Sequence, residues 1–208
     1  MKKLLFAVSA LAALSLLAPS TGFAQHVYPN QVGLYEFSDG TGATGTFDVG
    51  SPVTIFLVLT KPEVDGLPVT QINAFEVTLN FNPAGNMFKL AEVFPGNNVN
   101  VGDNSDIGQG FLEYIVGFAA SHPVTDESIT LVTFTFMHTA PGPIEVILTA
   151  TSKPAFPGQM VYQNASVAGD LRQMFTAAGP DGGPVYVFDG SAVAVENESF
   201  GSVKALYR

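Results

Sequence analysis

The strongest constraint on this chain is the segment "INAFEVTLNFNP" at residues 72–83, in which apolar and polar residues alternate. Alternation with a period of two is typical of a strand that has one buried side and one side in solvent. The Asn82-Pro83 pair then ends the strand, because proline has no backbone N–H to donate. The predicted buried side carries Phe75, Val77, Leu79 and Phe81.

Similar strand-like runs recur along the chain and are separated by turns rich in glycine and proline. Only residues 167–178 have a helical pattern, with Asp170 as the N-cap and an apolar side that includes Met174. About nine short strands predict an all-β fold, an antiparallel β-sandwich with one short helix near 167–178; a β-barrel is the alternative. The runs are 31–37, 53–60, 71–81, 87–94, 111–120, 129–136, 144–151, 185–188 and 192–196.

The composition favours a core packed between two sheets. The chain has 17 phenylalanines and no tryptophan. Phenylalanine has a large apolar ring without a polar group, so most of these rings are expected in the core, and an exposed aromatic stripe is the alternative. The chain has no cysteine, which excludes disulfides, thiol catalysis and cysteine-ligated metal sites. Such a domain is held together by core burial, by bound ions or by neighbouring molecules.

The first 24 residues are interpreted as an export signal. Two lysines precede an apolar run at residues 4–17, which is shorter than the about 20 residues that span a bilayer. Small residues at Gly22 and Ala24 favour cleavage after Ala24. The expected organisation is therefore a signal peptide (1–24), a β-sandwich domain (25–196) and a C-terminal tail (197–208). We expect the protein to be secreted or extracellular, at the cell surface, or in the periplasm.

The charge of the processed chain argues against two kinds of partner. Without Lys2 and Lys3, 6 of the 8 basic residues remain against 18 acidic residues, so the net charge is 6 − 18 = −12. Nucleic acids and anionic lipids are bound through lysine and arginine. We therefore expect no nucleic-acid partner and no binding to anionic lipid. Because the apolar run at residues 4–17 is removed with the signal, we also expect no membrane span after signal cleavage.

The polar loop "PGNNVNVGDNSDIGQG" at residues 95–110 is a candidate calcium site. Calcium takes six to eight oxygen ligands from carboxylates, amides and carbonyls, although the spacing here differs from that of an EF-hand. The alternative is a plain solvated loop, because Asn, Asp and Gly are also ordinary turn residues. No other cofactor is predicted. The candidate calcium ligands are Asn98, Asn100, Asp103 and Asp106.

The sequence contains no convincing catalytic group. Its three histidines are far apart, and no serine lies in a nucleophile-elbow motif. Asp126 and Glu127 are adjacent carboxylates, whereas a glycosidase pair must face each other across a cleft. A turn between two strands is the simpler explanation for this pair, and we expect the protein not to be an enzyme.

Residues 53 to about 150 resemble the cohesin-like sandwich. The resemblance lies in "VTIFLVL" (53–59), "INAFEVTLNFNP" (72–83) with an amide before the proline, and the later strands "FLEYIVGFAA" and "ITLVTFTFMHTAPGPIEVIL". It implies a non-enzymatic binding or structural role, and relatives of these modules include carbohydrate-binding sandwiches. The resemblance does not extend to residues 155–208, and it implies no particular contact residue.

Two functions are consistent with these features. The first is an exported binding or adhesion module that acts at the cell surface on a protein or glycan. The second is a structural subunit of an extracellular filament or surface layer, in which copies of the chain exchange strands through their termini. The residues predicted to contact a partner are Tyr35, Tyr114, Phe200, Leu206 and Tyr207.

Overall fold

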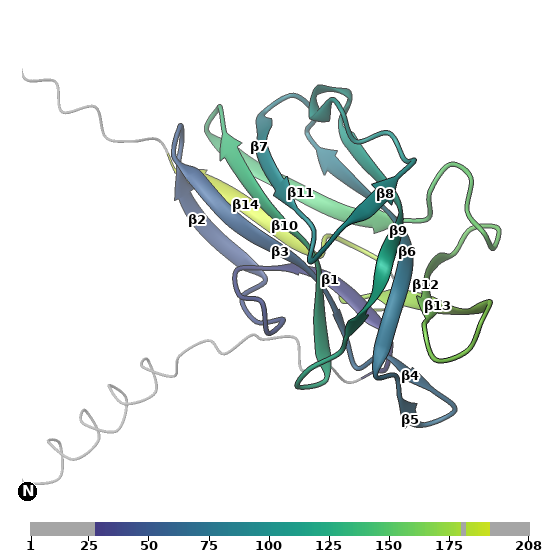
Figure 1. Ribbon diagram of the computed structural model, residues 1–208. Helices are drawn as coiled ribbons and strands as arrows, with labels where there is room; N and C mark the ends of the chain where they lie inside the picture. Colours follow the sequence, from purple (N-terminus) through teal and green to yellow (C-terminus); the bar gives the residue numbers. More distant parts are fainter. Residues whose placement is uncertain (1–27, 180–181, 192–208) are drawn as a thin grey trace, which may run out of the picture.

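The structure, a computed structural model, describes residues 28–179 and 182–191 (Figure 1). These residues form fourteen β-strands and one 3-10 turn, η1 (Ile107–Gln109). The first seven strands are β1 (Gln31–Tyr35), β2 (Thr44–Asp48), β3 (Pro52–Thr60), β4 (Glu63–Val64), β5 (Leu67–Pro68), β6 (Gln71–Asn82) and β7 (Met87–Val93). The others are β8 (Asn98–Asn100), β9 (Phe111–Pro123), β10 (Ser128–His138), β11 (Gly142–Thr149), β12 (Met160–Asn164), β13 (Asp170–Thr176) and β14 (Tyr186–Ser191).

One layer of the fold has the strand order β7-β10-β3-β1, and all neighbours in it are antiparallel. The central pair of this layer, β3 and β10, contains the predicted strands 53–60 and 129–136. Within the described residues β7 is the terminal strand of this layer and pairs only with β10. The layer therefore ends in an open strand edge at β7.

The second layer has the strand order β8-β9-β6-β11-β14-β2 and is organised around β6. One edge of β6 pairs with β9 along nearly its whole length. The other edge is shared, because β12 pairs with its first half up to Glu76 and β11 pairs with its second half from Thr78. β13 then joins β12 to β1, so twelve of the described strands form one continuous hydrogen-bonded sheet.

The core lies between the two layers, as predicted. Phe136 of β10 packs against Phe81 of β6 and Phe188 of β14, with ring centroids 5.7 and 5.8 Å apart. Phe134, the neighbour of Phe136 on the same face of β10, packs at 5.7 Å against Tyr114 of β9. The predicted inward side of β6 is confirmed, because Phe75, Val77, Leu79 and Phe81 are all buried.

The predicted helix at 167–178 is wrong, because residues 170–176 form strand β13. A turn at Gly169, whose φ is 76°, places β13 antiparallel to β12, and β1 pairs with its other edge. Backbone hydrogen bonds to two strands outweigh a weak helical propensity. Asp170, the predicted N-cap, instead accepts a hydrogen bond from Asn164 and pairs with Arg172 at 2.7 Å.

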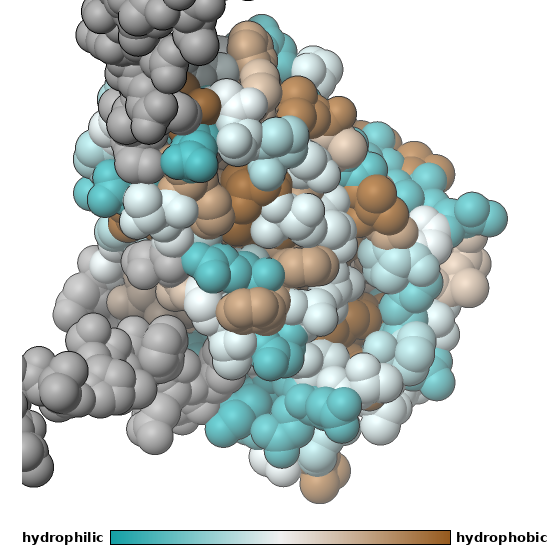
Figure 2. All heavy atoms as spheres, turned by 90° about the vertical axis from the view of Figure 1, so that its left-hand side faces the viewer, coloured by the Kyte–Doolittle hydropathy of each residue, from teal (hydrophilic) through white to brown (hydrophobic). Residues whose placement is uncertain are grey.

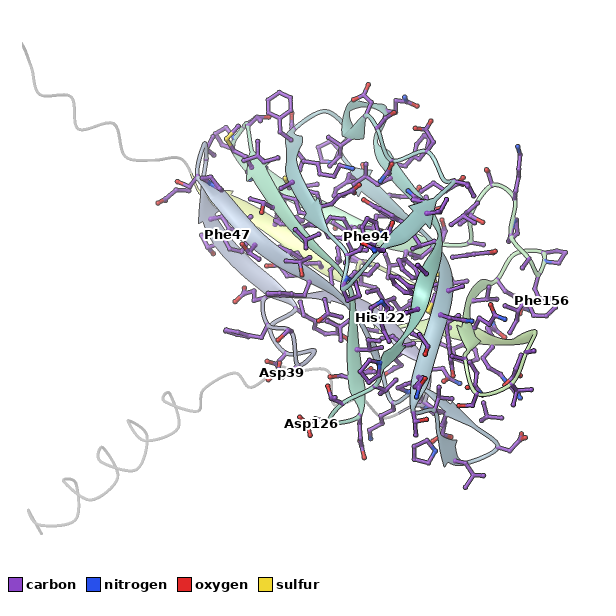
Figure 3. All side chains as sticks on the ribbon, in the orientation of Figure 1. Asp39, Phe47, Phe94, His122, Asp126 and Phe156 are labelled. Carbon is purple, nitrogen blue, oxygen red and sulfur yellow. The ribbon has the colours of Figure 1, made fainter. Side chains whose placement is uncertain are left out.

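The strand pairing and the 126–127 turn agree with the sequence in most respects. The sheets are mostly antiparallel, but β1–β13 and β2–β14 are parallel pairs. Asp126 and Glu127 occupy a tight turn at the tip of the β9–β10 hairpin, as expected (Figure 3). The signal peptide and the C-terminal tail lie outside the described residues, so these two assignments stay predictions.

Candidate interaction surface

Strand β7 exposes three large apolar side chains at the open edge of its layer. Phe88, Leu90 and Val93 are 57%, 50% and 61% exposed. Phe88 lies opposite Met137 and Val93 opposite Thr133 on β10, and a register shift separates these pairs at Leu90. The extra residue at this bulge puts Leu90 on the surface as well, although Met87 at the start of the strand is buried.

The second layer has a similar edge at β8. Val99 and Val101 are 66% and 72% exposed, and residues 94–97 connect β8 directly to β7. Five of the eleven exposed large hydrophobic residues of the described chain therefore lie within residues 88–101. We call Phe88, Leu90, Val93, Val99 and Val101 the β7–β8 edge.

Another side of the molecule has a different surface. Figure 2 shows the side that carries β2, where hydrophobic side chains are separated by hydrophilic ones. Isolated surface hydrophobic residues are normal in a folded protein, whereas a gathered set marks an interaction surface. The five residues of the β7–β8 edge lie within residues 88–101, in or directly after strands at the ends of the two layers.

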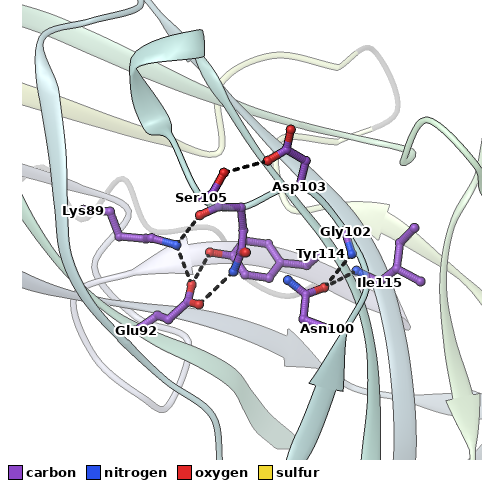
Figure 4. Close-up of polar contacts among 9 residues, drawn as sticks. Lys89, Glu92, Asn100, Gly102, Asp103, Ser105, Tyr114 and Ile115 are labelled. Atoms are coloured by element: carbon purple, nitrogen blue, oxygen red, sulfur yellow. Dashed lines mark hydrogen bonds and ion pairs between the residues drawn. The ribbon is translucent and has the colours of Figure 1, made fainter.

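A polar cluster lies beneath the β7–β8 edge and fastens it to the core (Figure 4). The Tyr114 hydroxyl of β9 donates a 2.8 Å hydrogen bond to Oε2 of Glu92 on β7. Lys89 Nζ donates to the same oxygen at 2.8 Å and also to the backbone oxygen of Asn104. Asn104 completes the cluster by donating through its Nδ2 to Glu92 Oε1 at 2.7 Å. Glu92 therefore links the edge strand, the core and the 95–110 loop.

The position of Tyr114 explains the strength of this link. Its ring is fully buried, and burial raises the pKa of its hydroxyl well above the ordinary value, with the nearby Glu92 carboxylate adding to the rise. The hydroxyl therefore stays protonated and remains a hydrogen-bond donor. Phe94 also points into the core at this place and packs at 6.2 Å against Tyr114 (Figure 3).

The predicted calcium ligands are spread along the 95–110 loop and contact the chain itself. Asn100 Oδ1 accepts hydrogen bonds from the backbone N–H groups of Gly102 and Ile115. Asp106 caps η1 by accepting from Gly108 N–H. The other two bond locally as well: Asn98 donates to Gly96 O, and Asp103 accepts from Ser105 Oγ. These contacts are those of a self-supporting loop, and the calcium site stays a prediction.

The two described histidines lie apart, and neither belongs to a group of acidic side chains that could hold a metal. His122 packs against Phe118 at 4.6 Å, while His138 is buried at the end of β10. Residues 28–179 and 182–191 contain no group of three or more His, Cys, Asp or Glu residues able to hold a metal ion. In the same residues no helix has the length and apolarity needed to cross a membrane.

The residues predicted to contact a partner are not those on the exposed surface. Tyr35 and Tyr114 are 1% and 0% exposed, so their side chains are unavailable to a partner in this structure. Phe200, Leu206 and Tyr207 lie outside the described residues. The sequence did not predict the β7–β8 edge, because its residues have the pattern of an ordinary strand. The local sequence does not show which strand lies at the edge of a sheet.

The comparisons with known proteins concern the fold. No protein-family model matches the sequence, and no curated protein matches it. Similar solved structures are cohesin modules, the class of domain that the sequence resembles. The seventh type I cohesin of ScaB from Pseudobacteroides cellulosolvens is 12% identical, with a TM-score of 0.49 over 81% of this chain and 96% of that chain.

Two further cohesins are similar at the same level. A type II cohesin domain from the cellulosome of Acetivibrio cellulolyticus is 13% identical, with a TM-score of 0.46 over 72% of this chain and 92% of that chain. A cohesin module from a family 33 glycoside hydrolase of Clostridium perfringens is 12% identical, with a TM-score of 0.44 over 64% and 84%. Identities this low and TM-scores below 0.5 transfer neither a contact residue nor a partner to this chain.

Proposed function

We propose that this chain is an exported, non-enzymatic binding module that contacts a protein partner at the cell surface through the β7–β8 edge. The observation that carries the proposal is that five exposed apolar side chains lie within residues 88–101, in or directly after the edge strands β7 and β8. The sequence resemblance to cohesin-like modules also implies a binding role.

The β7–β8 edge has the properties of a preformed contact surface. Glu92 and its partners Lys89, Asn104 and Tyr114, the Glu92 cluster, hold β7 and the 95–110 loop against the core. A partner therefore meets an ordered surface. Binding to such a surface costs little conformational entropy. No described strand pairs with the outer edge of β7, so an extended segment of a partner can add there as a further strand.

The test compares two lysine variants of the purified protein for binding to the surface of the cells that produce it. Leu90→Lys with Val93→Lys places two charges on the β7–β8 edge and should reduce binding at least tenfold. Leu67→Lys with Val167→Lys is the matched control, because Leu67 and Val167 are exposed apolar residues elsewhere, at 70% and 56%. Equal binding by the edge variant and the wild-type protein would refute the proposal, provided that both remain folded by circular dichroism.

The open edge of β7 also favours a second function, that of a structural subunit that assembles with copies of itself. An unpaired edge strand with apolar side chains accepts a strand from a neighbour. Light scattering of the purified protein over a range of concentrations distinguishes the two functions. If the molecular mass rises with concentration, and the Leu90→Lys, Val93→Lys variant abolishes this rise, the protein assembles with itself. A protein that is monomeric at every concentration rejects self-assembly.

A further inference from the structure

A pocket of about 630 Å³ lies where the shared edge of β6 divides between β11 and β12. Strand β11 ends its pairing with β6 at Thr149, and the chain pairs with β6 again as β12, which begins at Met160. β13 and the segment before β1 close the other side of the gap. The pocket is therefore built from elements other than the β7–β8 edge, and its volume is in the range of small-ligand sites.

The pocket has an apolar floor and an aromatic rim. Leu148, Met160 and Met174 line it and are buried, at 3%, 6% and 1% exposure. Tyr28 and Phe175 also line it, but they are 56% and 47% exposed. A large ring that is half exposed beside a pocket offers a flat apolar face to a ligand.

The polar groups of the pocket are amides and hydroxyls. Gln31, Gln159 and Gln173 line it, and Gln31 is only 5% exposed, so its amide side chain is largely removed from bulk water. Thr149 and Thr176 also line the pocket, and the hydroxyl of each donates to a nearby backbone oxygen, of Ala150 and Gly179. The three glutamine amides are the groups that can both donate to and accept from a ligand.

The described lining contains no charged side chain, although the sequence has 18 acidic residues. Among the described lining residues, an anionic ligand would find no cation and a cationic ligand would find no carboxylate. A purely hydrocarbon ligand would make no hydrogen bond with the three glutamine amides of the lining. The lining instead suits an uncharged ligand that combines apolar faces with many hydroxyl groups.

We propose that this pocket binds a neutral oligosaccharide. One face of a sugar ring would stack on Tyr28 or Phe175, and the glutamine amides would hydrogen bond to its hydroxyls. This site would act in addition to the protein contact at the β7–β8 edge, because the two surfaces share no residue.

The test is calorimetric titration of the purified protein with neutral hexasaccharides of glucose, xylose and mannose, and with a hexasaccharide of galacturonic acid. We expect at least one neutral probe to bind, and the acidic probe to bind at least tenfold more weakly. Tyr28→Ala and Phe175→Ala should each weaken binding of the neutral probe at least tenfold. Phe88→Ala and Phe37→Ala, which remove equally exposed rings outside the pocket, should leave it unchanged.

Three results would overturn the proposal. These are absence of binding by every neutral hexasaccharide, binding that survives both Tyr28→Ala and Phe175→Ala, and equal loss of binding in the control variants. Binding of a fatty acid or an apolar peptide that is lost on Phe175→Ala, without binding of any sugar, would assign the pocket to an apolar ligand instead. Each of these variants changes an exposed side chain, so its fold can be checked by its unfolding curve.

Discussion

The hydroxyl of Tyr114 and the carboxylate of Glu92 are 2.8 Å apart and join the core of one layer to the edge strand of the other. Around this contact, Lys89 and Asn104 hold the β7 strand and the 95–110 loop together. The proposed contact surface thus depends on a partly buried hydrogen bond that lies beneath it.

Removal of the Tyr114 hydroxyl should destabilise the protein without disturbing the core. Tyr114→Phe keeps the ring but removes a hydrogen bond to a charged acceptor, which contributes about 1.5–3 kcal/mol. We expect the free energy of unfolding in urea to fall by about this amount. Tyr28→Phe removes an exposed hydroxyl and is the control, with no measurable change expected. An unchanged Tyr114→Phe midpoint would show that the Glu92 cluster does not stabilise the fold.

Four buried tyrosines should make the fold sensitive to alkaline pH. Burial raises the pKa of Tyr35, Tyr114, Tyr162 and Tyr186 above the ordinary value of 10.0. Below pH 10 both the folded and unfolded forms carry the proton, so the stability contribution is fully present. Above pH 10 the unfolded chain loses protons that the folded chain keeps, and stability falls. Tyrosinate absorbance and circular dichroism should therefore change together above pH 10; ionisation of these four residues without unfolding would contradict the prediction.

His138 should make the protein less stable in mild acid. It is 1% exposed, neither ring nitrogen has a hydrogen-bond partner among the described residues, and burial lowers its pKa despite the nearby Asp189. The neutral ring is favoured in the folded state, so stability is present above the unfolded pKa of about 6.5 and is lost as pH falls below it.

The variant His138→Leu tests this expectation. It removes a buried polar group without a partner, which should raise the free energy of unfolding by about 1–2 kcal/mol at pH 5. The gain should be smaller at pH 7.5, where the unfolded histidine is also neutral. If the free energy of unfolding changes equally between pH 7.5 and pH 5 in the wild-type protein and in His138→Leu, the loss of stability in acid belongs to other groups.

The β9–β10 hairpin offers a stabilising substitution. Asp126 and Glu127 both have positive φ angles, 49° and 61°, and Thr125 and Ser128 exchange two backbone hydrogen bonds across the turn. Turns of this type favour glycine at the second position. Glu127→Gly should raise the free energy of unfolding by about 0.5–1 kcal/mol, while Ser128→Gly in strand β10 should lower it. A loss of stability in Glu127→Gly would mean that the glutamate makes a contact that compensates for its backbone conformation.

The calcium hypothesis for the 95–110 loop predicts a stability change with calcium. An ion that binds only the folded loop raises the melting temperature as its concentration rises. Asp103→Asn together with Asp106→Asn would remove two carboxylates and should abolish this rise. An unchanged melting temperature at millimolar calcium would reject the site and leave the loop to its own hydrogen bonds.

The sequence predicted the interior of the fold better than its surface. The alternation in β6 placed Phe75, Val77, Leu79 and Phe81 correctly, because burial of one side of a strand is a local pattern. The turn at Asp126 and Glu127 was also anticipated from the residues themselves.

The failures concern properties that depend on neighbours distant in sequence. Residues 170–176 form a strand because β12 and β1 pair with its two edges, and β1 belongs to the opposite end of the described chain. Tyr114 was predicted to contact a partner, but the opposite layer buries it. Tyr28 and Phe175, the aromatic rim of the pocket, come together only in the folded molecule.

The divided edge of β6 also has a consequence for the order of events during protein synthesis. Its hydrogen-bonding partners extend from β9 through β11 to Asn164 at the end of β12. Contacts so distant in sequence form slowly, since a long loop must close before each of them is made. A nascent polypeptide that ends before Asn164 leaves one edge of β6 without some of its partners. The domain therefore cannot close until most of it has left the ribosome.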